Sequence, residues 1–189
     1  MIIMNKKDGY TLIELLVVIT LMVLLLGGGV ATYFRFEERQ STEVVARELH
    51  RAFITARAKA RFREKANCTS TERVIGFRTL IRDDGGTKKV DILSICGSSR
   101  IDYDGAEPNS VQNEGPTTVV YTIPDNVTLE SPISTDLPYE VDFFTLYGGA
   151  WINGDPEPVQ VPITVSRGVA RYSFNIDGGA DISPVVKLN

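Results

Sequence analysis

The stretch NKKDGYTLIELLVVITLMVLLLGGG, residues 5–29, decides the fold of this 189-residue chain. Between residues 10 and 34 the sequence carries a single charged side chain, that of Glu14. A helix over these 25 residues spans roughly 37 Å at about 1.5 Å per residue, which is enough to cross a bilayer. Lys6 and Lys7 precede the segment and predict, by the positive-inside rule, that the short N-terminus stays in the cytoplasm.

Three interpretations of this segment differ in what happens to it after synthesis. A secretory signal peptide would use the two lysines as its basic region and the small residues 29–31 as its cleavage site. A signal anchor would leave the helix uncut in the membrane. Neither accounts for Glu14, because a carboxylate in a membrane helix costs up to roughly 3 kcal/mol near the centre. A charge that costs this much indicates that a partner group exists. The third interpretation is therefore a helix whose carboxylate has such a partner.

Residues 9–18, GYTLIELLVV, resemble the class III signal of type IV pilins and pseudopilins. That signal is a basic leader, a glycine, an aromatic or apolar residue, Thr-Leu-x-Glu and a long apolar helix. The resemblance implies that a prepilin peptidase cuts after Gly9 and that Tyr10, where phenylalanine is usual, becomes the N-methylated first residue. It also implies that Glu14 pairs with the N-terminal amine of a neighbouring subunit. In a low dielectric, two packed helices lose energy at every axial offset that leaves the carboxylate and the ammonium unpaired. Glu14 would therefore set the register of assembly.

A glycine triplet, Gly27, Gly28 and Gly29, follows the apolar run. Each glycine costs about 1 kcal/mol relative to alanine inside a helix. The resemblance to pilin-like filaments, in which helix is lost locally in this part of the stem, makes the triplet a candidate weak point. The alternative is close packing of helices at small residues.

Residues 35–66 contain no proline or glycine and keep a helical pattern. Their apolar side chains recur at helical spacing and predict a stripe buried against a sheet: Val45, Leu49, Ala52, Phe53, Ala56 and Ala60. Basic residues occupy every second position near the end, which spreads their charge around a helix instead of lining one face: Arg57, Lys59, Arg61, Arg63 and Lys65. The pattern favours a solvated helix end over a nucleic-acid patch.

The segment ARELHRAFITARAKARFREKANCTSTERVIGF, residues 46–77, is similar to the GspH/FimT-like branch of minor pilins and pseudopilins. The likeness is carried by Leu49, Phe53, Ala56, Arg57 and Ala60. Some members of that branch bind DNA through basic C-terminal residues, whereas residues 101–189 here hold three Lys or Arg against thirteen Asp or Glu. An acidic surface repels phosphate, so nucleic acid is not an expected partner.

Beyond residue 68 the sequence changes to short β-rich runs separated by turn residues: 73–82, 88–96, 117–123, 141–146, 159–165 and 168–176. Residues 83–86, Asp-Asp-Gly-Gly, predict a hairpin turn, and Ser166 and Arg167 are expected to separate the last two runs. Prolines 156, 158 and 162 predict that the run near residue 159 is an edge strand. The whole predicts an α+β fold: five to seven antiparallel strands, as a sheet or small sandwich, under one long helix.

Cys68 and Cys96 lack zinc-site spacing and have a single histidine, His50, to help them. A disulfide outside the cytoplasm would close the loop between them and stabilise by roughly 3 to 4 kcal/mol; the alternative is two buried thiols.

Asp102, Asp104 and Glu107 lie in a polar segment, residues 102–116, that is expected to be an exposed loop. Their spacing only partly imitates a calcium loop, so solvated turn residues are expected, with calcium as the alternative. No cofactor is expected. The single histidine and the missing nucleophile and phosphate-binding motifs argue against an enzyme.

The sequence thus predicts a leader (1–9), a membrane and filament-core helix (10–34), an amphipathic stem helix (35–66) and a β-rich head (67–189). The resemblance implies a structural subunit, a minor pilin or pseudopilin of a type IV pilus or type II secretion pseudopilus. It would cross the cytoplasmic membrane once, with the head outside. Its partners would be the prepilin peptidase, other pilins and the membrane assembly platform. The alternative is a DNA-binding minor pilin of an uptake pilus.

Overall fold

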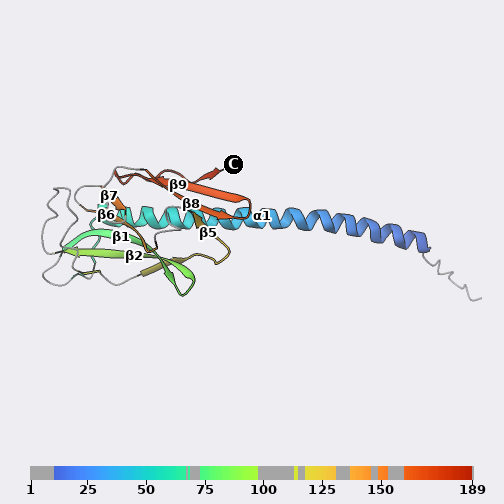
Figure 1. Ribbon diagram of the computed structural model, residues 1–189, viewed down its shortest axis with the longest axis horizontal. Coiled ribbons are helices and arrows are strands. Elements are labelled where there is room, and N and C mark those ends of the chain that lie inside the picture. Colours follow the sequence, from blue (N-terminus) through green and yellow to red (C-terminus); the bar gives the residue numbers. More distant parts are fainter. Residues whose placement is uncertain are drawn as a thin grey trace, which may run out of the picture. The chain divides into compact units, whose positions relative to one another are not determined.

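The computed structural model describes residues 11–66, 68, 73–97, 113–114, 118–130, 137–145, 149–152 and 160–188. The chain divides into two compact units, Met1–Glu37 and Glu38–Asn189. Helix α1 (Leu12–Arg61) contributes to both, and the strands all belong to the second unit. One long helix with antiparallel sheets confirms the predicted α+β class (Figure 1).

The second unit contains two antiparallel sheets. The first has the order β3-β2-β1-β6-β7, and β4 also pairs with β2. Its strands are β1 (Arg73–Asp84), β2 (Thr87–Gly97), β3 (Asn113–Glu114), β4 (Thr118–Thr122), β6 (Tyr139–Phe144) and β7 (Ala150–Ile152). The second sheet has the order β10-β9-β8-β5. Its strands are β5 (Thr128–Glu130), β8 (Val161–Arg167), β9 (Ala170–Ile176) and β10 (Val186–Leu188).

The predicted apolar stripe is the part of α1 that packs against both sheets. All six of its residues are buried, and they form one core with side chains of both sheets. In Figure 1 this half of α1 has β1 and β2 on one side and β8 and β9 on the other. Phe53 is fully buried, with its ring centroid 5.9 Å from that of Phe174 on β9. The stripe therefore buries one helix against both sheets at once.

The helix ends at Arg61, earlier than the expected end near residue 66. The Glu64 N–H donates to the Lys59 carbonyl at 3.0 Å, and the Arg63 N–H donates to the Ala60 carbonyl at 3.2 Å. With Arg63 at φ 49°, these bonds form a Schellman motif, which closes a helix with a left-handed residue. The Lys59 ammonium also contacts the Glu64 carboxylate at 2.6 Å across the motif. The prediction was wrong because arginine stands where glycine usually marks such an end.

Arg63→Gly is expected to stabilise the second unit by about 1 kcal/mol, because glycine adopts a left-handed conformation without a Cβ clash. Urea unfolding in detergent, followed by the fluorescence of the one tryptophan, Trp151, which is 4% exposed, measures this change. Arg61→Gly is the matched control: the same replacement in the last helical turn is expected to destabilise by a similar amount. Equal effects of the two variants would contradict the assigned helix end.

Two hairpins were predicted, and one has its turn elsewhere. Strands β1 and β2 pair up to Asp84 and Thr87 around Gly85 and Gly86, whose φ values of 65° and 90° suit a tight turn that only glycine adopts freely. The turn between β8 and β9 lies at Gly168 and Val169, not at the predicted Ser166 and Arg167, because both of those residues still pair with β9.

The edge-strand prediction for β8 is also wrong, since β8 lies between β9 and β5. Strand β5 reaches only residues 164–166 of β8, so Pro162 pairs with β9 alone and removes no bond to β5. The segment predicted as a loop contains β3, which pairs with the end of β2 at Ile95 and Cys96. The two- and three-residue strands β3, β5, β7 and β10 were not predicted.

Candidate functional site

The start of α1 holds the side chain that the sequence singles out. The Glu14 N–H donates to the Thr11 hydroxyl oxygen at 3.4 Å, and the Leu15 N–H donates to the Thr11 carbonyl at 3.2 Å. Thr11 is therefore the N-cap residue, and Glu14 lies in the first turn, where a negative charge is favoured by the helix dipole. Gly9 and Tyr10 lie outside the described residues.

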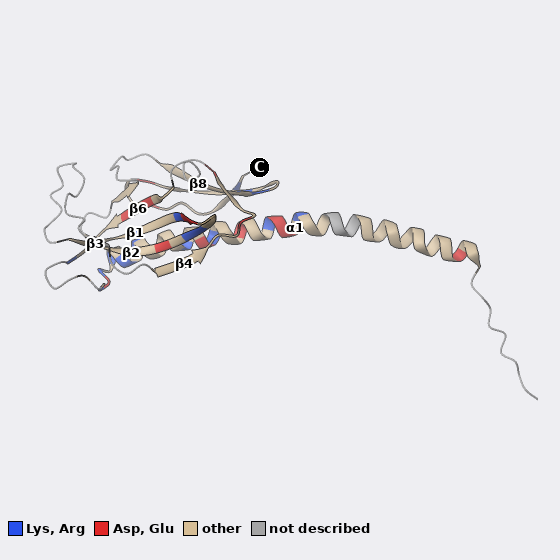
Figure 2. Ribbon diagram, turned by 60° about the horizontal axis from the view of Figure 1, so that its bottom comes forward, with Lys and Arg blue, Asp and Glu red and all other residues tan. Residues whose placement is uncertain are grey.

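The apolar residues of the first unit form an exposed surface. From Leu12 to Leu26 the large hydrophobic side chains are between 43% and 83% exposed. Among the described residues, one helix is long and apolar enough to span a membrane, with a mean hydropathy of 2.5 over its most apolar window and none of that window buried. Figure 2 shows this stretch free of charge except near its beginning. An apolar surface this continuous is what a bilayer or neighbouring helices cover.

Helix α1 is continuous through residues 27–29. The structure of the single chain therefore shows no break at Gly27, Gly28 and Gly29. Their role as a weak point in an assembled filament stays a prediction. A Cβ added at Gly27 would meet no atom within 4 Å, so this glycine is not required by packing within the chain.

Cys68 and Cys96 are joined by a disulfide with a Cα–Cα distance of 5.7 Å. The bridge connects the segment after α1 to the end of β2 and closes a separation of 28 residues. In the chain-entropy model a loop of this size contributes roughly 3 to 4 kcal/mol.

The basic residues near the end of α1 do not act as one group. The Arg57 guanidinium forms an ion pair with Asp181 of the β9–β10 connection, and Lys59 pairs with Glu64. Arg63 and Lys65 lie beyond the helix, so only part of the cluster occupies it. These pairs reduce the positive charge available to a phosphate backbone.

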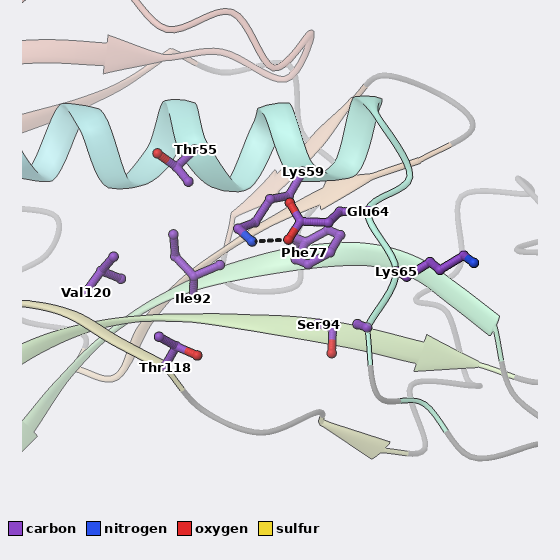
Figure 3. Close-up of a pocket in the computed structure, with 10 residues that line it drawn as sticks. Thr55, Lys59, Glu64, Lys65, Phe77, Ile92, Ser94, Thr118 and Val120 are labelled. Carbon is purple, nitrogen blue, oxygen red and sulfur yellow. Dashed lines mark hydrogen bonds and ion pairs between the residues drawn. The ribbon is translucent and has the colours of Figure 1, made fainter.

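A cavity of about 230 Å³ lies beside this helix end, between α1, β1, β2 and β4 (Figure 3). Phe77 and Ile92 form its apolar part, and the Lys59–Glu64 pair lies at its helix side, with the Lys59 ammonium 5.7 Å from the Phe77 ring centroid. Thr55, Ser94 and Thr118 supply hydroxyl groups. This set can bind a small polar group but contains no nucleophile paired with a base.

His50 is half-buried at the edge of the core. Its Nε2 atom lies 3.0 Å from the Ser183 carbonyl oxygen, and its ring packs edge-on against Phe174 at 5.2 Å between centroids. In the described ranges, no three His, Cys, Asp or Glu side chains converge as metal ligands do. The calcium candidates Asp102, Asp104 and Glu107 lie outside those ranges.

Several acidic residues of the C-terminal half pair with arginines, which the sequence did not reveal. Arg78 on β1 contacts Asp142 at 2.7 Å and Glu140 at 2.9 Å, both on β6. Arg171 on β9 binds Glu130 on β5, and its hydrogen bonds hold the pKa of that carboxyl below the usual value. Arg78, Asp142 and Arg171 lay on predicted strands whose pairing was not yet known, whereas Glu130 lies on a strand that was not predicted. These acids therefore connect strands and are not merely solvated.

Together these features define a class: a subunit that anchors or assembles through an exposed apolar helix and carries an α+β head. Residues 4–30 match the family model described as the prokaryotic N-terminal methylation motif. This match supports a type IV pilin-like or pseudopilin subunit. It does not extend to the GspH/FimT-like branch. Comparison with curated proteins and with solved structures gave no match.

Proposed function

We propose that this chain is a structural subunit, a minor pilin or pseudopilin, of a type IV pilus or a type II secretion pseudopilus. It is made as a prepilin, cut after Gly9, methylated at Tyr10 and added to a filament through its N-terminal helix. The apolar surface from Leu12 to Leu26 packs in the filament core, and Glu14 pairs with the N-terminal amine of a neighbour. The second unit faces outward.

The observation that carries this proposal is the combination of the methylation motif at residues 4–30 with an exposed apolar helix that begins at Leu12. The motif explains why a charged residue stands in the first turn of such a helix. The disulfide is consistent with a head outside the cytoplasm, since such bonds persist in oxidising compartments. The proposed topology is therefore a cytoplasmic N-terminus, one membrane span and an exported head.

The partners of the proposed subunit follow from this route. A prepilin peptidase processes it, a membrane assembly platform receives it, and other pilins contact its helix. Its proposed role is packing and register, and no cofactor is proposed for that role.

The N-terminal mass of the protein, expressed with and without a prepilin peptidase, tests the proposal. The expected result is a chain that starts at Tyr10, with or without an added methyl group, only when the peptidase is present. A chain that starts at Thr32 would identify an ordinary secreted protein. A chain uncut in both samples would identify a simple membrane anchor, and either result would refute the roles of Gly9 and Glu14.

A further inference from the structure

Strand β4 is the outer strand of the first sheet where it pairs with β2. Within the described residues, no strand pairs with its other edge. The Ile123 N–H donates to the Lys88 carbonyl at 2.9 Å, next to the pair of Thr122 and Lys89. Because hydrogen-bonded and non-hydrogen-bonded pairs alternate along an antiparallel ladder, the N–H and C=O groups of Thr122 point away from β2. Strand β4 therefore presents an unpaired backbone edge at Thr122.

This edge lacks the charges that often protect an exposed strand. Residues 116–124, PTTVVYTIP, contain no charged side chain, and β4 carries no charge colour in Figure 2. By contrast, the outer strands of the second sheet, β5 and β10, carry Glu130 and Lys187. Val119 and Val120 on β4 are 48% and 46% exposed. An uncharged edge with exposed β-branched side chains is a template for a further strand.

One residue of β4 is extra relative to β2. Tyr121 pairs with Val90 and Val119 pairs with Asp91, so Val120 between them has no partner on β2. A β-bulge of this kind redirects a side chain. Here Val120 lines the cavity of about 230 Å³ beside the end of α1 (Figure 3). The unpaired edge and the cavity are therefore neighbours on the same strand.

The cavity suits one uncharged side chain. Phe77 and Ile92, both buried, supply its apolar wall. Its two opposite charges, on Lys59 and Glu64, already neutralise one another at 2.6 Å. A charged side chain would have to compete with that ion pair and lose its own hydration, whereas an apolar side chain is stabilised by burial against the wall.

We propose that β4 binds an extended, uncharged segment of another polypeptide by strand addition, with one apolar side chain of that segment in the cavity. In this mode of recognition, backbone hydrogen bonds supply affinity and pockets for alternate side chains supply specificity. A strand rises about 3.3 Å per residue, so a segment of about five residues reaches from Thr122 to the cavity wall at Thr118. All of these residues belong to the second unit, so the inference goes beyond the proposed function and does not depend on it.

Capped, dye-labelled peptides of alternating threonine and valine, with one central guest residue, test the inference. They are titrated with the full-length chain in detergent micelles, and binding is followed by fluorescence anisotropy against empty micelles. The leucine-guest peptide is expected to bind roughly tenfold more tightly than the alanine-guest peptide, because leucine buries more apolar surface. The aspartate-guest peptide is expected not to bind.

Thr122→Pro tests the backbone edge. Proline removes the N–H group that points away from β2 and breaks no hydrogen bond to β2, so the strand is expected to stay folded. Thr122→Val is the matched control, since it keeps the N–H and loses only the hydroxyl. The proline variant is expected to bind the leucine-guest peptide at least tenfold more weakly, and the valine variant as well as the unchanged chain. Unfolding followed by Trp151 fluorescence checks that both variants are folded.

Two further measurements do not depend on the proline variant. A leucine-guest peptide N-methylated at alternate amides lacks the donors that face β4, and it is expected to bind at least tenfold more weakly. Thr118→Phe places an aromatic ring at the cavity from an exposed strand position, where aromatic residues are favoured. It is expected to remove the advantage of leucine over alanine.

Binding that is unaffected by Thr122→Pro and by N-methylation would overturn strand addition. Equal binding of the leucine-guest and alanine-guest peptides to the unchanged chain would overturn the role of the cavity. If no peptide binds and the chain instead forms dimers that Thr122→Pro dissociates, the edge belongs to a second copy of the chain and the proposal is wrong.

Discussion

Replacing Glu14 with alanine is expected to abolish incorporation of the subunit into filaments while cleavage after Gly9 continues. Glu14 is the only charged residue between positions 11 and 34. Apolar helices packed together have no strong preference for one axial offset, so the proposed pair between this carboxylate and a neighbouring ammonium would select the offset. The measurement is the amount of mutant subunit in filaments sheared from cells, compared with the amount of processed subunit left in the membrane.

Glu14→Gln is the matched control, because Glu14 also occupies the position of the acidic residue in a capping box. Thr11 and Glu14 have the spacing of a capping box, and the Thr11 hydroxyl accepts the Glu14 N–H. Glutamine serves at this position of a capping box but carries no charge. If charge sets the register, Glu14→Gln fails as completely as Glu14→Ala. Normal incorporation of the glutamine variant would show that Glu14 only caps the helix and would refute its pairing role.

Phe53→Ala is expected to lower the free energy of unfolding of the second unit by about 3 to 5 kcal/mol. Phe53 is 0% exposed and lies in the core shared by α1 and both sheets, where it packs against Phe174. Removing its ring leaves a cavity between layers that cannot easily close. Denaturant unfolding in detergent, followed by Trp151 fluorescence, gives the difference.

The adjacent residue supplies the comparison for this prediction. Ile54 is 42% exposed on the same turn of α1, so Ile54→Ala is expected to change the stability by less than about 1 kcal/mol. If both variants lost a similar amount of stability, the prediction that only the Phe53 face of α1 packs between the sheets would be contradicted.

The helical half of the fold could be predicted because its signal is repeated. Val45, Leu49, Phe53, Ala56 and Ala60 follow one helical face, and each is buried. The helix end could not be predicted in the same way. Its left-handed residue is Arg63, and the hydrogen bonds that fix it come from Arg63 and Glu64 N–H groups, which every sequence has.

The β half was predictable where strands are long or turns are marked by glycine. Strand β1 and its turn at Gly85 and Gly86 have both signals. Strand β5 has three residues, too few for alternation to be seen, and it forms because Leu129 is buried in the shared core opposite Val165 of β8. The β8–β9 turn is an exception: it was misplaced although Gly168 marks it, because Ser166 and Arg167 continue the strand by pairing with β9.

The site was predictable to the extent that its chemistry is local in sequence. Glu14 in an apolar run needs no tertiary contact to be noticed. The ion pair between Arg57 and Asp181 joins residues 124 positions apart, and no local pattern reports it.

The bridge between Cys68 and Cys96 also has a mechanical consequence. In the proposed filament, a load would pull on each subunit through its helix, and tension in the backbone beyond Arg61 would reach Cys68 first. There the covalent bond transfers the load directly to the end of β2, in the interior of the six-stranded sheet. Residues 69–95, which include all of β1, lie outside that path. The strand that pairs with both β2 and β6 is thus spared from being pulled out of the sheet one hydrogen bond at a time.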